Sequence, residues 1–340
     1  AMNIALIGLG MVAATHVLAI KSAAKLHLGG VLGRDSAKTA DFAARYATRA
    51  FASVQEIAQD PAIDFVILAT PPNARRDIVQ VLAAAGKPIL MEKPIERDVQ
   101  AATELVQICA QAGVPLAIML QHRAREASQA LKRALDAGEL GEICTVDLRV
   151  PWWRAQSYYD APGRGTYGRD GGGVMISQAI HTLDLAIWLL GPVRSVQAMM
   201  RQTALHNLEA EDWAGALFEM QCGAVGTLLA TTAAYPGGAE TIAVQGTKAA
   251  AHLGSGVLEI SYLDGRRTRV GAEGSTGGGA DPMAFTHEWH QSVIEDFAQA
   301  LSSGGQPLAT GESALEAQAV IDAMQRASES GQTQQVQRWG

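Results

Sequence analysis

The sequence predicts a two-domain α/β protein, in which a doubly wound parallel sheet is followed by a domain of mixed helices and strands. Three observations support this fold class. A chain of 340 residues is long enough for two domains of ordinary size. Residues 1–121 alternate short apolar runs with alanine-rich stretches, whereas residues 122–340 contain many short strands separated by turn residues. We therefore predict one domain over each of these two ranges.

Short apolar runs in the first domain predict strands that are buried on both faces. They are Asn3–Ile7, Leu26–Leu32, Asp64–Ala69, Pro88–Met91 and Pro115–Leu120. The helical segments between them are Met11–Ala24, Ser36–Ala47, Asn73–Ala85 and Asp98–Ala112. Two of these helices end in a glycine followed by a proline, at Gly86-Lys87-Pro88 and Gly113-Val114-Pro115. Strand–helix alternation of this kind predicts a parallel sheet with right-handed crossovers.

The second domain begins with a predicted helix, Ala124–Ala137, and a strand, Ile143–Val150. A loop rich in Trp, Tyr, Arg and Gly covers residues 151–173 and leads into a helix that ends near Leu190. Further runs predict strands: Val193–Arg201, Ala214–Gln221, Ala224–Thr232, Thr241–Gln245, Ala249–Leu253, Val257–Tyr262 and Arg267–Val270. A glycine-rich loop, Gly271–Ala280, precedes two amphipathic helices, which are free to pack back on the first domain.

Composition excludes several classes of partner. The formal net charge is -7, which leaves no basic footprint for nucleic acid or an anionic membrane. Cys109, Cys144 and Cys222 lie far apart, which argues against a zinc site or a disulfide framework and fits a reducing cytoplasm. We expect no bound metal. No apolar run is long enough to predict a membrane span.

A glycine motif follows the first predicted strand and opens the first helix. Gly8-Leu9-Gly10-Met11-Val12-Ala13 has the spacing of the dinucleotide fingerprint, with Ala13 as the third small residue. Gly8 would allow the tight turn, and Gly10 would let the backbone approach a pyrophosphate. Met11 and Val12 would present the N–H groups of the helix N-terminus. The alternative is a glycine turn that binds nothing.

The end of the second strand bears on the choice of dinucleotide. NAD is usually held by an acidic residue there, whereas the 2′-phosphate of NADP needs an arginine. Gly33 stands at the position expected for the acid and Arg34 follows it, which favours NADP over NAD. If Arg34 merely belongs to a loop and Asp35 serves as the N-cap of the next helix, NAD remains possible.

Three ordered motifs resemble one known family. The fingerprint is followed by Glu92-Lys93-Pro94, and then by Gly171-Gly172-Gly173 leading into Ser177-Gln-Ala-Ile-His181-Thr-Leu-Asp184. Nearly the whole chain resembles the Gfo/Idh/MocA oxidoreductases, which include glucose–fructose oxidoreductase and inositol dehydrogenase. The resemblance implies a Rossmann domain followed by an α+β domain with a large, mostly antiparallel open sheet. It also implies a homodimer or homotetramer formed through that sheet, and hydride transfer at a sugar-like hydroxyl or carbonyl carbon.

The chemistry of such a transfer needs a group that exchanges the hydroxyl proton and a charge that stabilises alkoxide character. Lys93 follows a parallel strand, where ligands of doubly wound sheets bind, and is the candidate for polarising the reacting oxygen. Glu92 and Lys93 are also expected to contact the cofactor. His181 lies opposite the apolar stripe of its predicted helix and is the candidate general acid/base and substrate ligand. The simpler alternatives are an exposed loop lysine and a structural histidine.

Two residues near His181 complete the catalytic set. Many members of the family carry an aspartate where this chain has Ser177, and a serine can orient a hydroxyl but cannot accept its proton at neutral pH. His181 and Lys93 would therefore carry more of the work. Asp184 lies one turn after His181, and it would either orient the imidazole or form an ordinary salt bridge on the helix face.

Other candidates follow from their positions. Thr70-Pro71-Pro72-Asn73 closes the third strand and resembles the family's loop against the cofactor riboses, although Pro71 and Pro72 also suit a helix start. Gln121 and Arg123 end the last strand, where Gln121 is expected near the cofactor; Arg123 matches an arginine that the family uses near cofactor or substrate, which implies a place beside the substrate. The loop with Trp153, Arg154 and Tyr158 mixes aromatic faces and forked donors that suit a sugar or sugar acid; a plug between domains is the alternative. His287 and His290 are expected mainly to pack.

Two other functions remain open at this level. A relative could keep the dinucleotide site and act as a sensor or co-repressor without turnover. A relative could also use tightly held NAD as a transient oxidant during glycoside cleavage. Lys93 and His181 favour a dehydrogenase or reductase acting on a sugar, cyclitol or sugar acid.

Overall fold

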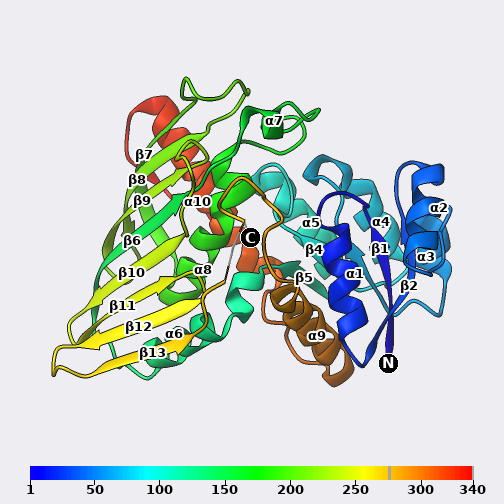
Figure 1. Ribbon diagram of the computed structural model, residues 1–340, viewed down its shortest axis with the longest axis horizontal. Coiled ribbons are helices and arrows are strands. Elements are labelled where there is room, and N and C mark those ends of the chain that lie inside the picture. Colours follow the sequence, from blue (N-terminus) through cyan, green and yellow to red (C-terminus); the bar gives the residue numbers. More distant parts are fainter. Residues whose placement is uncertain (275–276, 339–340) are drawn as a thin grey trace. The chain divides into compact units, whose positions relative to one another are not determined.

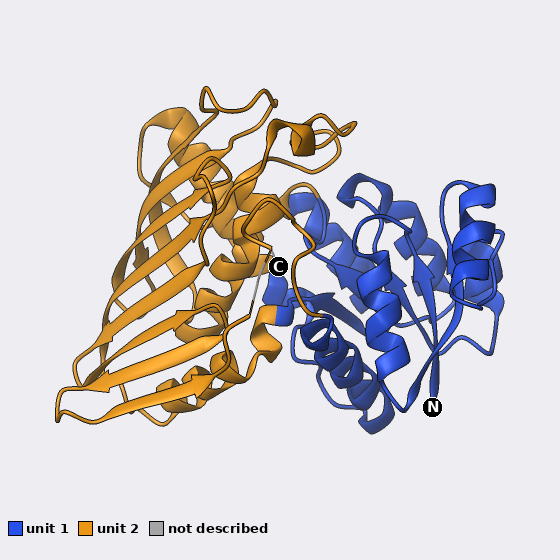
Figure 2. Cartoon of the chain, in the orientation of Figure 1, with its two compact units in different colours: residues 1–96, 100–121, 287–314 blue, residues 97–99, 122–286, 315–340 orange. Residues whose placement is uncertain are grey.

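The computed structural model describes residues 1–274 and 277–338. The chain divides into two compact units, which are coloured separately in Figure 2. The first comprises residues 1–96, 100–121 and 287–314, and the second comprises residues 97–99, 122–286 and 315–340. The chain thus crosses between the units more than once, and each unit is described below by itself. No helix in the described part of the chain has the length and apolarity needed to cross a membrane.

The first unit is built on a five-stranded sheet in the order β2-β1-β3-β4-β5, and every neighbouring pair is parallel. The strands are β1 (Met2–Ile7), β2 (Leu26–Leu32), β3 (Phe65–Leu68), β4 (Ile89–Glu92) and β5 (Leu116–Met119). The connecting helices are α1 (Ala13–Ser22), α2 (Ser36–Arg45), α3 (Val54–Gln59), η1 (Pro72–Ala74), α4 (Arg76–Ala84) and α5 (Val99–Gln111). This arrangement confirms the doubly wound sheet predicted from the alternating pattern.

Helix α9 (Glu288–Ser303) completes the first unit, although it follows most of the second unit in sequence. It packs against α1, and the ring of Phe297 meets that of Phe65 edge to face at 5.2 Å. The helix ends at Gly304, whose left-handed φ of 70° suits glycine. The next residues run beside β5, where the amide of Ile118 donates to the carbonyl of Ala309 at 3.0 Å. The C-terminal segment therefore closes one edge of the parallel sheet.

The second unit contains a nine-stranded sheet in the order β13-β12-β11-β10-β6-β9-β8-β7-β14, which Figure 1 shows as one curved layer. Its strands are β6 (Ile143–Pro151), β7 (Val193–Arg201), β8 (Trp213–Met220), β9 (Val225–Thr231), β10 (Thr241–Gly246), β11 (Ala249–Gly254), β12 (Val257–Tyr262), β13 (Arg267–Gly271) and β14 (Gln334–Gln335). Among the described residues of this second sheet, β6 and β9 are the only neighbours that pair in parallel. The large, mostly antiparallel sheet is therefore confirmed.

Helices cover one face of this sheet. They are α6 (Glu126–Asp136), η3 (Met175–Ala179), α8 (Ile180–Leu190) and α10 (Gly311–Ser330). The short helices η2 (Gln121–Ala124) and α7 (Gln156–Tyr159) lie in connecting segments. Along β6, Val146, Leu148 and Val150 are buried in the helix-facing core. The residues between them are more exposed, because successive strand side chains point to opposite faces. The sheet thus has one packed face and one open face.

The sequence did not predict the short elements α3, α7, η2 and β14, nor the separation of η1 from α4. Each of these short elements spans six residues or fewer. The start of α3 also depends on one capping contact, in which the Ser53 side chain accepts from the amide of Glu56. A periodic pattern needs a longer window than these elements provide. Of the predicted loop Gly271–Ala280, residues 275–276 lie outside the described residues, and Gly271 belongs to β13.

Candidate active site

In the first unit, the predicted cofactor residues gather at one edge of the parallel sheet. Gly8 and Gly10 follow β1, Arg34 follows β2, Thr70 follows β3, and Lys93 follows β4. The strand order changes direction at β1, which has β2 on one side and β3 on the other. Ligands of open parallel sheets bind outside the carboxyl ends of the strands at such a switch point. The sheet topology therefore makes this edge the candidate nucleotide site.

Gly8 and Gly10 have different surroundings in the fold. Gly8 has a φ of 102°, and a Cβ there would overlap the backbone of Ala69 and Thr70 at the end of β3. A contact within the fold thus explains Gly8. At Gly10, no described atom lies within 4 Å of the place where a Cβ would stand, so packing gives no reason for glycine. Open space before the N-terminus of α1 fits close approach of a pyrophosphate, with Met11 exposed and Val12 as the N-cap.

The residues after β2 adopt the local structure that the sequence left open. Asp35 is the N-cap of α2, and its carboxylate accepts from the amide of Lys38 at 3.0 Å. That backbone hydrogen bond lowers the pKa of Asp35 below its usual value. The amide of Gly33 donates to the Thr39 hydroxyl at 3.0 Å, and Arg34 is exposed. Asp35 therefore serves the helix, while Arg34 remains accessible to solvent.

The Glu92 carboxylate lies in a buried cluster with two histidines. It accepts from Nε2 of His16, on α1, at 2.8 Å, and lies 4.0 Å from Nε2 of His290, on α9. Burial raises the pKa of Glu92, but His16, His290 and Lys93 outweigh burial and leave it at about 2. Burial and the neighbouring His16 lower the pKa of His290 to about 3. The side chain predicted to contact cofactor therefore joins β4 to α1 and α9, and His290 packs as expected.

The other predicted cofactor residues in the segments after β3, β4 and β5 differ in how exposed they are. Lys93 is half-buried and forms a cis peptide bond with Pro94. In the loop after β3, Pro72 is buried in η1, Asn73 is exposed, and the Thr70 hydroxyl donates to the carbonyl of Ala74 at 3.3 Å. Gln121, after β5, is buried, and its Oε1 has no hydrogen-bond partner among the described residues. A buried acceptor of this kind fits a ligand donor.

In the second unit, the triple glycine is explained by Glu211. The amides of Gly173 and Met175 donate to the Glu211 carboxylate at 3.1 and 3.0 Å. A Cβ on Gly173 would overlap the carbonyl oxygen of Glu211. Burial raises the pKa of Glu211, and these amides partly offset that effect. Glu211 therefore anchors the start of the helical segment that carries His181, and the sequence offered no signal for it.

Ser177 and His181 lie on consecutive helical elements. Ser177 is in η3, a π-type turn, and His181 is in the first turn of α8. Insertions of this type often occur at functional sites because they re-aim the side chains that follow. The imidazole of His181 stacks on that of His122 with 4.6 Å between ring centroids. Helix α8 is buried on nearly all sides, so the face predicted to be open is covered.

Asp184 and Arg123 form a buried ion pair one turn beyond His181. The Arg123 guanidinium donates to both carboxylate oxygens, at 2.9 and 2.8 Å. Burial raises the pKa of Asp184, and Arg123 offsets part of that effect. Of the two roles considered for Asp184, the salt bridge is the one with these contacts, and its partner is the predicted substrate residue Arg123. The pair joins α8 to η2.

The aromatic loop packs against the same helical segment. Gln178, next to Ser177, donates to the Tyr158 hydroxyl at 3.1 Å. Arg154 is buried and donates to the carbonyls of Trp153 and Gly279, both at 2.9 Å. The Trp153 ring meets that of Tyr235 edge to face at 5.3 Å. Tyr158 thus lies close to η3, whereas the Arg154 guanidinium is engaged by backbone carbonyls.

No three His, Cys, Asp or Glu side chains within residues 1–274 and 277–338 gather in an arrangement that could hold a metal ion. The first-unit site instead offers open space at Gly10, a helix N-terminus and an unsatisfied amide oxygen. These features fit a dinucleotide. The sheet topology and the open position at Gly10 define a Rossmann domain of the kind that binds dinucleotides.

The chain belongs to the Gfo/Idh/MocA family. A profile described as "Oxidoreductase family, NAD-binding Rossmann fold" matches residues 2–120, and one described as "GFO/IDH/MocA C-terminal domain" matches residues 128–252. The family membership predicted from the three motifs is therefore confirmed.

Named relatives resemble the chain over nearly its full length. A D-apiose dehydrogenase of Rhizobium rhizogenes is 27% identical, covering 97% of this chain and 96% of its own. An inositol 2-dehydrogenase of Rhizobium meliloti is 26% identical, covering 94% and 95%. The crystal structure of the WlbA dehydrogenase from Bordetella pertussis, in complex with NADH and UDP-GlcNAcA, has a TM-score of 0.86 at 26% identity and covers 99% of this chain and 98% of that one.

Proposed function

We propose that the protein is an NAD(P)-dependent dehydrogenase or reductase that acts on a secondary alcohol or carbonyl carbon of a sugar, cyclitol or sugar acid. The observation that carries the proposal is the set of strand ends in the first unit, where Gly10, Arg34, Thr70 and Lys93 share one edge of the sheet. Relatives named for apiose and inositol support the substrate class. Residues 1–121 would bind the cofactor, and residues 122–340 would bind substrate and mediate oligomerisation.

Each proposed residue has a distinct task. A bound nicotinamide would accept or deliver a hydride at its C4 atom. The Lys93 ammonium would donate a hydrogen bond to the reacting oxygen and stabilise its negative charge. The His181 imidazole would exchange the hydroxyl proton, because histidine is the side chain that most often serves as a general acid or base. The Ser177 hydroxyl would orient the substrate hydroxyl, and Tyr158 and Trp153 would offer aromatic surface to the sugar.

Turnover of Lys93→Met and His181→Ala tests this mechanism. A panel of inositol, apiose, xylose and UDP-GlcNAcA would be screened for formation of reduced cofactor. Both variants should lose at least about a hundredfold in turnover while NADPH still quenches tryptophan fluorescence. Lys25→Met and His27→Ala, at exposed positions of the first unit, are the matched controls. Near wild-type turnover in both active-site variants would refute the mechanism. Binding without any turnover would favour a sensor, and sugar release without net reduction would favour glycoside cleavage.

NADP is the preferred cofactor in this proposal. Gly33 stands where NAD would need an acid and Arg34 is exposed after β2, which supports NADP, whereas the role of Asp35 as the N-cap of α2 keeps NAD as the alternative. Some structural relatives are bound to NADH, which is a property of those proteins. Measuring Kd for NADPH and NADH would test the preference. Arg34→Ala should weaken NADPH binding selectively, whereas Arg45→Ala, exposed at the end of α2, should change neither constant.

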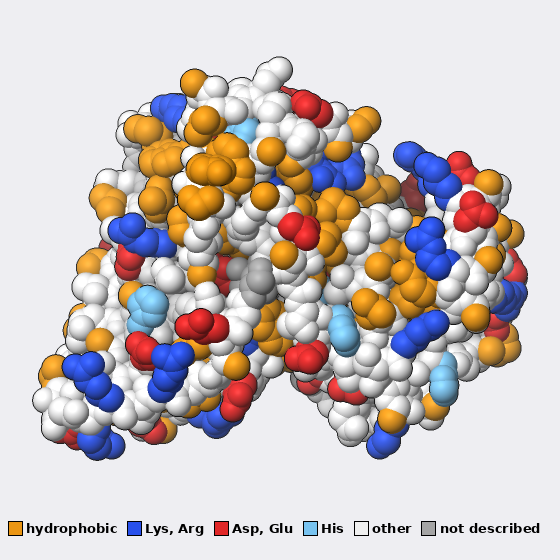
Figure 3. All heavy atoms as spheres, viewed as in Figure 1, with side chains coloured by type: hydrophobic (Ala, Val, Ile, Leu, Met, Phe, Trp, Pro, Cys, Tyr) orange, Lys and Arg blue, Asp and Glu red, His pale blue; other side chains and the backbone are white. Residues whose placement is uncertain are grey.

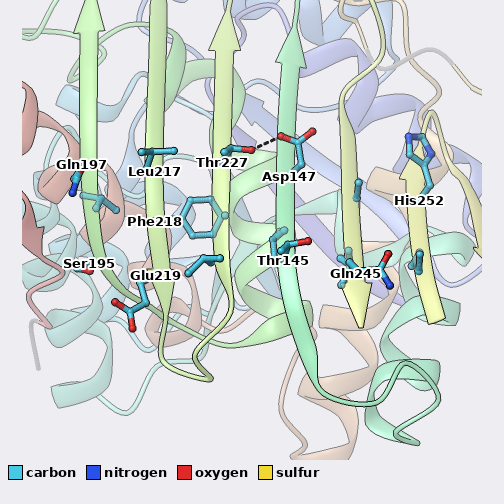
Figure 4. A pocket seen from close by; sticks show the side chains of 18 of the residues that line it. Thr145, Asp147, Ser195, Gln197, Leu217, Phe218, Glu219, Thr227, Gln245 and His252 are labelled. Carbon is cyan, nitrogen blue, oxygen red and sulfur yellow. Dashed lines mark hydrogen bonds between the residues drawn. The ribbon is translucent and has the colours of Figure 1, made fainter. Parts of the chain in front are cut away.

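The open face of the second-unit sheet is the proposed homo-oligomer interface. Figure 4 shows this face, where Leu217 stands near Thr227 and Asp147, and the two polar side chains share a 2.5 Å hydrogen bond. The face is hollowed by about 840 Å³ and exposes Leu217 and Val225 by 57% and 54%. A patch of this kind on a soluble surface marks an interface. Leu217→Arg should lower the mass measured by light scattering, whereas Leu263→Arg, in an exposed turn, should not.

The proposal also includes a cytoplasmic location and no nucleic-acid partner. Cys109, Cys144 and Cys222 are free thiols, which fits a cytoplasmic enzyme. On the face drawn in Figure 3, Lys and Arg side chains are interspersed with Asp and Glu instead of forming one basic stripe. That distribution gives no support to nucleic acid as a partner. Cell fractionation would test the cytoplasmic assignment, which a periplasmic location would contradict.

A further inference from the structure

Arg75 is a buried cation that the proposed mechanism does not use. It stands between η1 and α4 and is only 2% exposed. Burial lowers the pKa of Arg75 to about 10, with Glu92 and Glu96 opposing that effect, so the guanidinium stays charged at neutral pH. A buried charge is costly unless it is fully hydrogen-bonded. The partners of Arg75 therefore indicate what its charge stabilises.

The Arg75 guanidinium donates its hydrogen bonds to backbone carbonyls. Nε and Nη2 donate to the carbonyl of Thr70, at 3.1 and 2.7 Å. Nη1 donates to the carbonyl of Glu92 at 2.6 Å, to that of Ile95 at 3.3 Å, and to that of Pro94. One planar group thus joins the loop after β3 to the loop after β4. Both loops were predicted to face the cofactor.

The carbonyls on the β4 side flank Lys93. Glu92 precedes it, and Pro94 and Ile95 follow it, so the guanidinium holds the backbone on both sides of the lysine. The opposite edge of the guanidinium is fixed at Thr70, close to the end of β3. Lysine could not replace this arrangement, because its ammonium is a point charge with three donors on one atom, whereas arginine has five donors in a rigid fork.

We propose that Arg75 is a positioning residue, which fixes the backbone of Lys93 against the loop that follows β3. The inference rests on the proposed role of Lys93. This positioning role differs from a purely structural one, because the loss of Arg75 should lower turnover by displacing Lys93. Misplacing a catalytic group by about 1 Å can lower a rate about a hundredfold.

A double-mutant cycle with Arg75→Lys and Lys93→Met tests the coupling. Turnover would be measured with the most active compound of the substrate panel, and NADPH binding by tryptophan fluorescence. Arg75→Lys should lower kcat about a hundredfold in the wild-type background, and should cost little more when Lys93 is already methionine. Arg76→Lys is the matched control, because Arg76 is the next residue, is half exposed and pairs with Glu104 on the surface.

Chemical rescue separates hydrogen bonding from general stability. Millimolar guanidinium chloride should restore part of the kcat of Arg75→Ala, and ammonium chloride should not. Wild-type kcat in Arg75→Lys, or losses that multiply independently of Lys93→Met, would overturn the inference. Should Lys93→Met alone keep full turnover, the proposed role of Lys93 fails first, and that result is visible without any Arg75 variant.

Discussion

The guanidinium of Arg123 donates to both oxygens of the Asp184 carboxylate, at 2.9 and 2.8 Å, and both side chains are almost completely buried. The residue before Arg123 is His122, whose ring stacks on His181. Asp184 itself lies one helical turn after His181. The ion pair and the stacked rings therefore hold the same two elements, η2 and α8, together. These contacts hold the His181 imidazole in a fixed position relative to η2.

Breaking this ion pair should be costly only when one partner remains. Arg123→Leu or Asp184→Leu alone should lower the free energy of unfolding by about 3–5 kcal/mol, because an uncompensated charge stays buried. The double variant should lose less than the sum, as chemical denaturation would show. Arg194→Ala, whose pair with Glu219 is nearly half exposed, is the comparison and should cost less than about 1 kcal/mol. Additive losses at Arg123 and Asp184 would contradict the pairing.

Two glycines of the fingerprint should respond differently to alanine. Gly10→Ala should leave the melting temperature unchanged, because open space surrounds that position, yet weaken NADPH binding by at least about tenfold, or 1.4 kcal/mol. Gly8→Ala should lower the melting temperature, since it forces a side chain into the Ala69 backbone at a positive φ. Thermal melts and fluorescence titrations would separate the two effects. Unchanged affinity in Gly10→Ala would remove the assignment of this site to a dinucleotide.

The glycines before the His181 helix offer a similar contrast. Gly173→Ala would drive a Cβ into the carbonyl of Glu211 and should destabilise the second unit strongly. Gly168, in the same loop, has no described atom within 4 Å of a Cβ and lacks a positive φ, so Gly168→Ala should be nearly neutral. Differential scanning calorimetry would measure both. Equal melting temperatures for the two variants would mean that the contact with Glu211 is not essential.

The buried cluster in the first unit predicts a pH dependence of stability. His290 has an ordinary pKa of 6.5 and a folded pKa of about 3, so the unfolded chain binds more protons between these values. The free energy of unfolding should therefore decrease as pH falls below 6.5, by at most about 1.4 kcal/mol per pH unit from this group. Below pH 4.5, the ordinary pKa of Glu92, this carboxyl binds a proton in the unfolded chain but stays ionised in the folded protein, where its pKa is about 2, and this difference adds to the decrease.

His290→Gln isolates the contribution of the histidine. Between pH 6.5 and 4.5, this variant should lose stability less steeply than the wild type, as urea denaturation at several pH values would show. His27→Gln replaces an exposed histidine on β2 and should keep the wild-type slope. A wild-type slope in His290→Gln would mean that the imidazole is not buried in its neutral form.

The fold could be predicted from the sequence because long, repeated hydrophobic patterns specify its strands and helices. Strands β2, β7 and β12 have the predicted bounds, and buried runs bounded by glycine and proline identified the parallel sheet. The site was predictable where residues sit at strand ends, as for Gly10 and Lys93, because topology alone places them. Their catalytic and binding roles stay predictions.

Other site residues gave no usable pattern. Arg75 follows a proline-containing loop, and such an arginine is ordinarily exposed, so its burial depends on carbonyls contributed by a second loop. Glu211 reaches the triple glycine from a distant stretch of chain. His16 lies in a helix next to the fingerprint, and its partner Glu92 follows 76 residues later. Long-range partners of single polar residues cannot be derived from local periodicity.

The late position of α9 in the chain has a consequence for synthesis. A ribosome makes β6 through β13 before α9 emerges, although α9 belongs with α1 and β5 in the first unit. Until then, the nascent Rossmann sheet lacks the helix that carries His290 and Phe297, and the surface of α1 that α9 covers stays exposed to chaperones. A nascent chain arrested before residue 287 should therefore bind chaperones more readily than the finished chain does.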